Sequence, residues 1–176
     1  MIFVYIFAGL ILTLLVVAAL LPNNYLIEQS IVIKKPVSEV QKKVFDFNAY
    51  STWNPWQKTE PGATKTISGV PGTPGHRYEW SGKKIGAGSL TLKHVDDRHV
   101  NIDLQFLKPW KTLAKDSWLF ESWGDGSETK VTWQNSGELP WPIARLMGPV
   151  LNKSLNHQFK TGLGNMKQMC EGTVSL

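Results

Sequence analysis

The sequence predicts an α+β fold, in which an antiparallel sheet packs against one long C-terminal helix. Apolar residues recur at helical spacing from Pro142 to about Cys170, and the segment from Ala63 to Val131 alternates apolar and polar residues between turns. A helix of this length spans roughly 40 Å, so a long surface must cover its apolar face. Because strands precede this helix rather than alternate with helices, we expect a sheet covered on one side, with the long helix against its concave face.

The C-terminal helix carries one apolar stripe, which we expect to be buried. Gly148 and Pro149 interrupt the pattern, so we expect a short lead-in helix followed by the long one. Gly162 and Gly164 are poor helix formers with two interpretations: a close approach of helix to sheet, or a gap left for a ligand. The stripe consists of Ile143, Leu146, Met147, Val150, Leu151, Leu155, Phe159, Leu163, Met166 and Met169.

An apolar segment without a charged residue, Met1 to Leu21, begins the chain. About 20 such residues are long enough to cross a bilayer. A signal peptide is the alternative, but no Lys or Arg precedes the segment, and Ala18-Ala19-Leu20-Leu21 fits a cleavage site poorly. We therefore expect a transmembrane anchor over residues 1–22 and a folded domain over residues 24–172.

The charges indicate where this domain lies. Lys34 and Lys35 follow the apolar segment, which favours a cytoplasmic domain under the positive-inside rule. All charged side chains lie beyond the anchor and give a net charge of +5, so the domain should be attracted to anionic headgroups. The basic residues are scattered rather than clustered, which argues against nucleic acid as a partner. The single cysteine, Cys170, excludes an internal disulfide and a thiol metal cluster.

The segments between anchor and C-terminal helix read as one helix and a series of strands. Tyr25 to Ile33 alternates as a half-buried strand, and Ser38 should cap an amphipathic helix from about Ser38 to Asn48. Turns, one of them at Pro109, separate the later strands. These strands are Gly75 to Trp80, Gly88 to Val95, His99 to Phe106, Asp116 to Glu121 and Thr129 to Asn135.

Two tryptophans flank a proline in the segment Trp53-Asn54-Pro55-Trp56, which should be a loop or a short bent helix. Two interpretations are open. The rings could form a plug that seals one end of the core, or an aromatic lip at the mouth of a pocket, where an indole offers apolar area and one hydrogen-bond donor.

Four stretches make the chain resemble the START-like superfamily, also called SRPBCC, which includes the polyketide cyclase/dehydrase and lipid-transport family. They are Ile31 to Pro36 with the Val40 to Phe47 helix, Trp53-Asn54-Pro55-Trp56, Thr129-Lys130-Val131-Thr132-Trp133, and Lys160 to Lys167, which contains Gly-Leu-Gly-Asn-Met-Lys. The resemblance runs from about Asn24 to Glu171. It implies the helix-grip fold, a curved antiparallel sheet around a long C-terminal helix that encloses an apolar cavity.

The inventory of catalytic residues is thin. His76, His94, His99 and His157 show no paired metal-ligand spacing, the acidic residues lie mostly at turns or opposite the apolar faces, and we expect neither a metal nor a cofactor. His76 and His94 share an apolar strand face by alternation. Each could carry a proton, although a hydrogen-bonded histidine at a strand end is the simpler interpretation.

The leading hypothesis is a membrane-anchored binding module for a lipid or another hydrophobic small molecule, since apolar pockets are lined by aromatic rings with few polar groups. A cyclase or dehydratase with His76 or His94 as proton carrier and Tyr78 as donor is the second hypothesis. A platform for docking an unidentified protein, as in the chaperone-activating branch of the superfamily, is the third. The predicted ligand-binding residues are Trp53, Trp56, Tyr78, Trp80, Leu92, His94, Leu104, Phe106, Trp118, Phe120, Trp133, Phe159 and Leu163.

Overall fold

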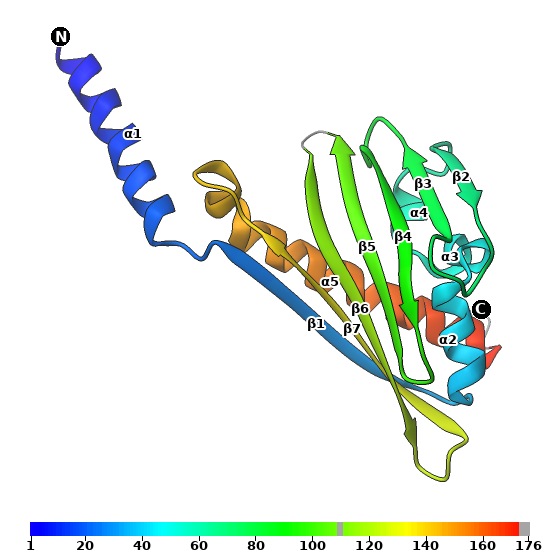
Figure 1. Cartoon of the computed structure of the whole chain (residues 1–176). Coiled ribbons are helices and arrows are strands. Elements are labelled where there is room, and N and C mark those ends of the chain that lie inside the picture. The colour runs from blue at the N-terminus through cyan, green and yellow to red at the C-terminus, as the bar shows by residue number, and fades with distance from the viewer. Residues whose placement is uncertain (109–110, 173–176) are drawn as a thin grey trace.

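A computed structural model describes residues 1–108 and 111–172, and the turn predicted at Pro109 lies outside this range. The prediction of an α+β helix-grip fold is confirmed: seven antiparallel strands form one curved sheet in the order β1-β7-β6-β5-β4-β3-β2, and a long helix, α5, lies against it (Figure 1). Only β1 is out of sequence order, because it pairs with β7 along its whole length, from Asn24 with Glu138 to Ile33 with Thr129.

The elements follow the predicted strands closely. The strands are β1 Asn24–Ile33, β2 Thr64–Ser68, β3 Arg77–Ser81, β4 Ala87–Val95, β5 His99–Lys108, β6 Thr112–Trp123 and β7 Glu128–Glu138. The helices are α1 Ile2–Leu20, α2 Val37–Phe45, α3 Phe47–Trp53, α4 Trp56–Thr59 and α5 Ile143–Glu171.

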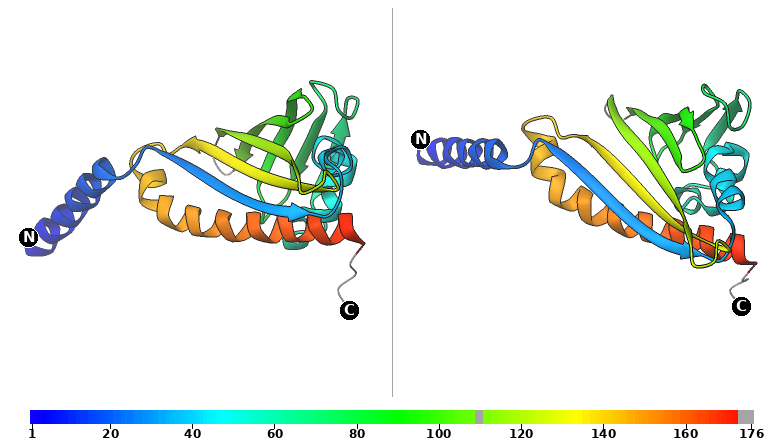
Figure 2. Two further views of the ribbon diagram at one scale, coloured as in Figure 1. Left: turned by 90° about the horizontal axis from the view of Figure 1, so that it is seen from below. Right: turned by 60° about the horizontal axis from the view of Figure 1, so that its bottom comes forward.

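The curvature of the sheet divides its contacts with α5. Strands β1 and β7 run along the helix, whereas β2, β3 and β4 project away from it, beside α2 and α3 (Figure 2). Helix α2 contacts β5, β6 and β7, and both α2 and α3 contact α5. Asn165 bonds to Trp53, so α3 meets the C-terminal half of α5. The core therefore lies where the sheet, α2, α3 and the second half of α5 meet.

The terminal helix differs from the sequence prediction in two ways. It is one helix from Ile143 to Glu171 with Pro149 inside, so the expected break is wrong. Pro149 lies within the second turn, where its missing N–H removes one helical hydrogen bond and leaves the rest of the helix intact. The stripe is also buried only in part. Phe159, Leu163 and Met166 are buried, whereas Ile143, Met147 and Val150 are exposed.

The predicted helix from Ser38 to Asn48 is divided in two. Pro36, not Ser38, occupies the N-cap of α2, and Asp46 takes an extended conformation between α2 and α3. The Asp46 carboxylate accepts a hydrogen bond from the backbone N–H of Asn48 at 3.0 Å, which caps α3. Because the chain turns at Asp46, α3 can carry Phe47, Tyr50 and Trp53 into the core.

The N-terminal helix α1 extends away from the domain (Figures 1 and 2). Among the described residues it is the one helix long and apolar enough to cross a membrane, a criterion that a signal sequence would also meet. Nearly all its side chains are exposed, and Ala18, near the end of the helix, is buried.

Candidate functional site

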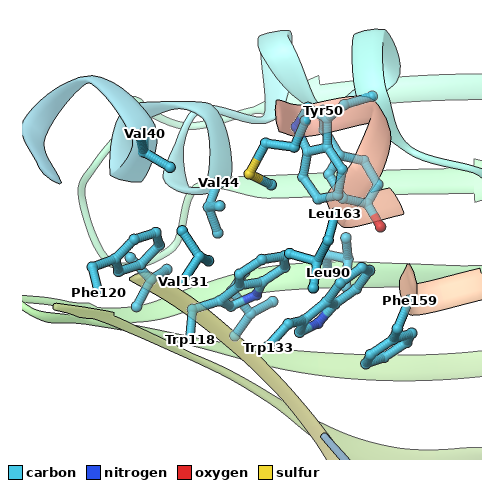
Figure 3. Close-up of a cluster of buried hydrophobic side chains, with 14 of the residues drawn as sticks. Val40, Val44, Tyr50, Leu90, Trp118, Phe120, Val131, Trp133, Phe159 and Leu163 are labelled. Carbon is cyan, nitrogen blue, oxygen red and sulfur yellow. The ribbon is translucent and has the colours of Figure 1, made fainter. Parts of the chain in front are cut away.

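The inner face of the sheet carries a continuous stack of aromatic rings at the level of α3. Trp118 and Trp133, paired across β6 and β7, stack with ring centroids 4.4 Å apart, and Phe159 of α5 stacks on Trp133 at 3.8 Å. Phe120 continues the stack beyond Trp118. Figure 3 shows these four rings below Tyr50 and Leu163. We call Phe120, Trp118, Trp133 and Phe159 the aromatic stack. It fills the space between sheet and helix at this level.

Trp53 belongs to the core, which supports the plug interpretation over the lip. Its side chain is 1% exposed and meets the rings of Trp118 and Trp133 edge to face at 5.7 and 5.8 Å. Its indole N–H donates to the carbonyl oxygen of Lys43 at 2.9 Å. Trp56 is only half-buried and approaches Trp133 and Phe159 edge to face. The two tryptophans therefore have different roles.

His76 is a structural histidine. It is buried and stacks on Phe47 with ring centroids 4.8 Å apart. Its Nε2 accepts from the backbone N–H of Phe47 at 3.1 Å, and its Nδ1 lies 2.9 Å from the carbonyl oxygen of Ser68, which requires a proton on Nδ1. Both ring nitrogens are thus occupied by the backbone, and neither is free to transfer a proton.

His94 does not share the inner face, so its predicted place beside Leu92 is wrong. The pairing of β4 with β5 shifts between Leu92 and His94, which marks a β-bulge. One extra residue reverses the alternation, so His94 points outward, and it lies 3.1 Å from the carboxylate of Asp96. The histidine contributes to a polar turn and lies outside any apolar site.

A buried carboxyl group, Asp116 on β6, lies at the edge of the aromatic stack and was missed in the sequence prediction. Its side chain receives three hydrogen bonds: from the indole of Trp133 at 2.7 Å, from the indole of Trp118 at 3.1 Å, and from the amide of Asn135 at 3.2 Å. The residue is 5% exposed, and burial raises the pKa of Asp116 to about 6, against the lowering effect of these bonds. Within residues 1–108 and 111–172, no Lys, Arg or His forms a salt bridge with it.

Two tyrosines, Tyr25 and Tyr50, lie near Asp116 and Asn135, and we call these four residues the polar centre. The hydroxyl of Tyr25 donates to the Oδ1 of Asn135 at 2.8 Å, and burial together with the charge of Asp116 raises the pKa of Tyr25 to about 12. Burial, with the charge of Asp116 as a second cause, also raises the pKa of Tyr50 well above its usual value. A signal for this centre was present in the sequence, because Asp116 has the same strand parity as Trp118 and Phe120.

Beyond Asp116 the inner face is less covered. Trp80, Leu104 and Phe106 are only half-buried, although they lie on the same face as the aromatic stack. Trp80 meets Phe106 edge to face at 6.0 Å, across the small residue Gly88. Ala114, paired with Leu104, is also small. We call Trp80, Leu104, Phe106 and Ala114 the open rows, since small side chains separate large apolar ones there.

The remaining predicted ligand residues are core residues in this structure. Tyr78, Leu92 and Leu163 are buried, as are the four members of the aromatic stack. Apart from the exposed His94, the predicted ligand residues therefore fall into two groups. Most are buried in the core, and four are half-buried: Trp56, Trp80, Leu104 and Phe106. Among the described residues, no group of three or more His, Cys, Asp or Glu side chains is placed to hold a metal ion.

The Gly-Leu-Gly-Asn-Met-Lys segment in α5 contacts α3, β1 and β7. A Cβ on Gly162 would lie 3.1 Å from the Trp133 ring and 3.2 Å from Pro55, so Gly162 marks a close approach of helix to sheet. Asn165 donates to the carbonyl oxygen of Trp53 at 3.0 Å, and Lys167 donates to that of Val32 at 2.7 Å. Gly164 has open space beside it.

Comparisons with known proteins agree on the fold. No family model and no curated protein matches the sequence. Among solved structures, protein MLL2253 from Mesorhizobium loti superposes with a TM-score of 0.62 at 11% identity, covering 86% of this chain and 100% of its own. The Aha1 dimer from Colwellia psychrerythraea gives 0.60 at 17% identity, covering 84% and 96%. DynU16, from the dynemicin biosynthetic locus, gives 0.57 at 16% identity, covering 83% of this chain and 47% of its own.

Proposed function

We propose that this chain is a membrane-anchored binding module of the START-like superfamily that takes up a lipid or another hydrophobic small molecule. The observation that carries the proposal is that the large side chains of the open rows are only half-buried. Trp80, Leu104 and Phe106 lie on the concave face of the sheet, yet they stay half-buried because α5 runs along β1 and β7. Large apolar side chains in such a position favour an apolar ligand as their cover.

The polar centre supports a ligand with one hydrogen-bonding group. Asp116 and Ala114 lie two residues apart on the same face of β6, which places them roughly 7 Å apart. An apolar body over the open rows would then bring a polar end towards Asp116, Asn135 and Tyr25. Above its pKa of about 6, Asp116 can only accept hydrogen bonds, so a donor such as a hydroxyl or an amine is favoured.

The N-terminal helix and the net charge of the domain support a membrane location. Helix α1 serves as a single-pass anchor in this proposal, and the domain, with its net charge of +5, faces the cytoplasm and its anionic headgroups. A lipid ligand would then be available beside the protein. Nucleic acid has no part in the proposal, because no basic cluster was found in the sequence.

The enzyme hypothesis loses the proton carriers on which it was built. Both ring nitrogens of His76 are bonded to the backbone, and His94 lies on the outer face. The docking hypothesis predicts a protein partner retained in stoichiometric amounts in a pull-down, and nothing in the packing of the inner face requires such a partner.

A fluorescent fatty acid tests the proposal on the fragment lacking residues 1–22. Titration with cis-parinaric acid should give saturable one-to-one binding with energy transfer from the tryptophans. Ala114→Phe fills the open rows and should weaken binding by about tenfold or more, which corresponds to about 1.4 kcal/mol. Leu113→Phe is the matched control, because Leu113 is the adjacent residue of β6 on the exposed outer face and should bind like the parent. Equal binding by both variants would exclude the open rows as the site.

A further inference from the structure

The first turns of α5 carry an exposed apolar face. Ile143, Met147 and Val150 follow the spacing i, i+4, i+7, so they lie on one side of the helix, and Trp141 comes just before the N-cap residue, Pro142. All four side chains are between 51% and 63% exposed. Single exposed apolar residues are normal on protein surfaces, but three on one side of a helix, with a tryptophan just before the helix, make a cluster. We call these four residues the apolar patch.

The patch is not needed to hold α5 in the fold. On the opposite side of the helix, Gly148 is buried, and a Cβ there would lie 3.0 Å from Leu139. Leu151, three residues further on, is half-buried on the same side of the helix. The start of the helix is thus packed through one side, which leaves the apolar patch available for another contact.

The position of the patch indicates what covers it. Helix α1 contacts α5, and Ala18, close to the end of α1, is its buried residue. Figures 1 and 2 show the end of α1 beside the start of α5. If α1 spans the bilayer, its last turn reaches the headgroup region, and the first turns of α5 lie at the same level. From Ile143 to Val150 the helix rises roughly 10 Å, a length that fits along this boundary.

We infer that the apolar patch inserts into the headgroup boundary of the bilayer and holds the domain in one orientation on the membrane. This inference rests on the anchor in the proposed function. Trp141 suits the position, because tryptophan is enriched where the membrane meets water. Lys153 is exposed on the next turn of α5 and can meet anionic headgroups. A helix with an apolar side in the acyl boundary and basic residues beside it is typical of interfacial binding.

The orientation has a consequence for the ligand route. Asn24 pairs with Glu138, so β1 begins and β7 ends at the side of the domain nearest the anchor. Tyr25 lies at this end of the inner face, and its hydroxyl reaches Asn135 in the polar centre. A domain held by the apolar patch would therefore keep this end of its inner face towards the bilayer, which is the source of a lipid ligand.

Depth-dependent quenching tests the inference on the full chain in vesicles of phosphatidylcholine with phosphatidylglycerol. Met147→Cys is labelled with an environment-sensitive fluorophore in a Cys170→Ser background, because Cys170 is the only native cysteine. Lipids with a spin label near the headgroup should quench this fluorophore strongly. Gln168→Cys is the matched control, since Gln168 is exposed near the other end of the same helix and should be quenched little. Val150→Cys replaces Met147→Cys if the first variant does not fold.

The outcomes separate this inference from the proposed anchor. Extraction of the full chain from vesicles by alkaline carbonate would contradict the anchor, and with it the inference. A chain that resists extraction, but whose Met147 and Gln168 labels are quenched equally, would overturn the inference alone. Disulfide cross-linking through Met147→Cys with no quenching by lipid would assign the patch to a second copy of the chain. A double variant, Ile143→Glu with Val150→Glu, should reduce quenching at Met147 several-fold while the chain stays in the membrane fraction.

Discussion

The indole nitrogen of Trp133 donates a hydrogen bond to the Oδ1 of Asp116 across 2.7 Å, from one strand to its neighbour. The register of β6 and β7 pairs Asp116 with Asn135 and Trp118 with Trp133. Both indoles turn their N–H groups to the same carboxyl, which fixes the plane in which the rings stack. The polar centre and the aromatic stack are therefore one structural unit, and a ligand in the open rows would lie against its edge.

Asp116 should make the stability of the domain depend on pH. Burial raises its pKa to about 6 in the folded chain, whereas an unfolded chain has an aspartate pKa of about 3.9. Between these values the folded state holds a proton that the unfolded state has released. The free energy of unfolding should therefore fall as pH rises through this window, by about 3 kcal/mol in total, and this contribution should be constant at higher pH.

Urea unfolding at a series of pH values checks this expectation. Asp116→Asn cannot titrate, so the difference in unfolding free energy between parent and variant should slope between about pH 4 and 6 and be flat above. Asp97→Asn, in an exposed turn, serves as the control and should keep the slope of the parent. A parent and an Asp116→Asn variant with parallel profiles would show that the carboxyl titrates alike in both states.

Trp53→Ala should destabilise the domain as strongly as Trp133→Ala, by roughly 3–5 kcal/mol, because both rings are buried in the aromatic core. Trp56→Ala should cost clearly less, since Trp56 is half-buried. Urea unfolding of the three variants gives the order. If Trp53→Ala unfolds like Trp56→Ala and instead loses ligand binding, the lip interpretation of the segment is correct and the plug is wrong.

Two glycines in α5 form a matched pair for the contact between helix and sheet. Gly164→Ala adds a methyl group into open space and should stabilise the helix by about 0.5–1 kcal/mol. Gly162→Ala should destabilise it, because the new Cβ meets the Trp133 ring, which is stacked on both sides and cannot move aside. Thermal unfolding should separate the two variants in opposite directions from the parent. Equal stabilisation would place the helix farther from the sheet.

Deletion of residues 1–22 should leave a folded domain in the soluble fraction, because β1 begins at Asn24 and pairs along its whole length with β7. The far-UV circular dichroism of the fragment should show the sheet and α5, and its unfolding should be cooperative. Aggregation in buffer without detergent would count against a domain boundary at this place.

The sequence predicted the sheet and the long helix because strand alternation and helical spacing are local signals. Every predicted strand overlaps an observed one, from Tyr25 to Asn135. His94 was misplaced because a β-bulge between Leu92 and His94 reverses the alternation of inward and outward side chains. No residue type in that strand indicates the extra residue. The helix is continuous through Pro149 because a proline in its second turn removes only one hydrogen bond.

The site was harder to predict because burial depends on the whole sheet. Asp116 shares parity with Trp118, yet a charged residue in a strand normally faces water, and only the register with β7 brings the indole of Trp133 to it. The exposed start of the α5 stripe has a similar cause. Helical spacing identifies an apolar side, but it cannot tell how much of that side the domain itself covers: Phe159 is buried, whereas Ile143 is exposed.

Photolabelling with a diazirine-bearing fatty acid tests ligand binding at the open rows most directly. The full chain in lipid nanodiscs is irradiated with the probe, and the labelled peptides are mapped by mass spectrometry. The account predicts labels on the segments that carry Trp80, Leu104 and Phe106, removed by excess unlabelled fatty acid and by Ala114→Phe but not by Leu113→Phe. Labels confined to α1 and to the first turns of α5 would contradict it, because the fatty acid would then reach the protein only from the bilayer.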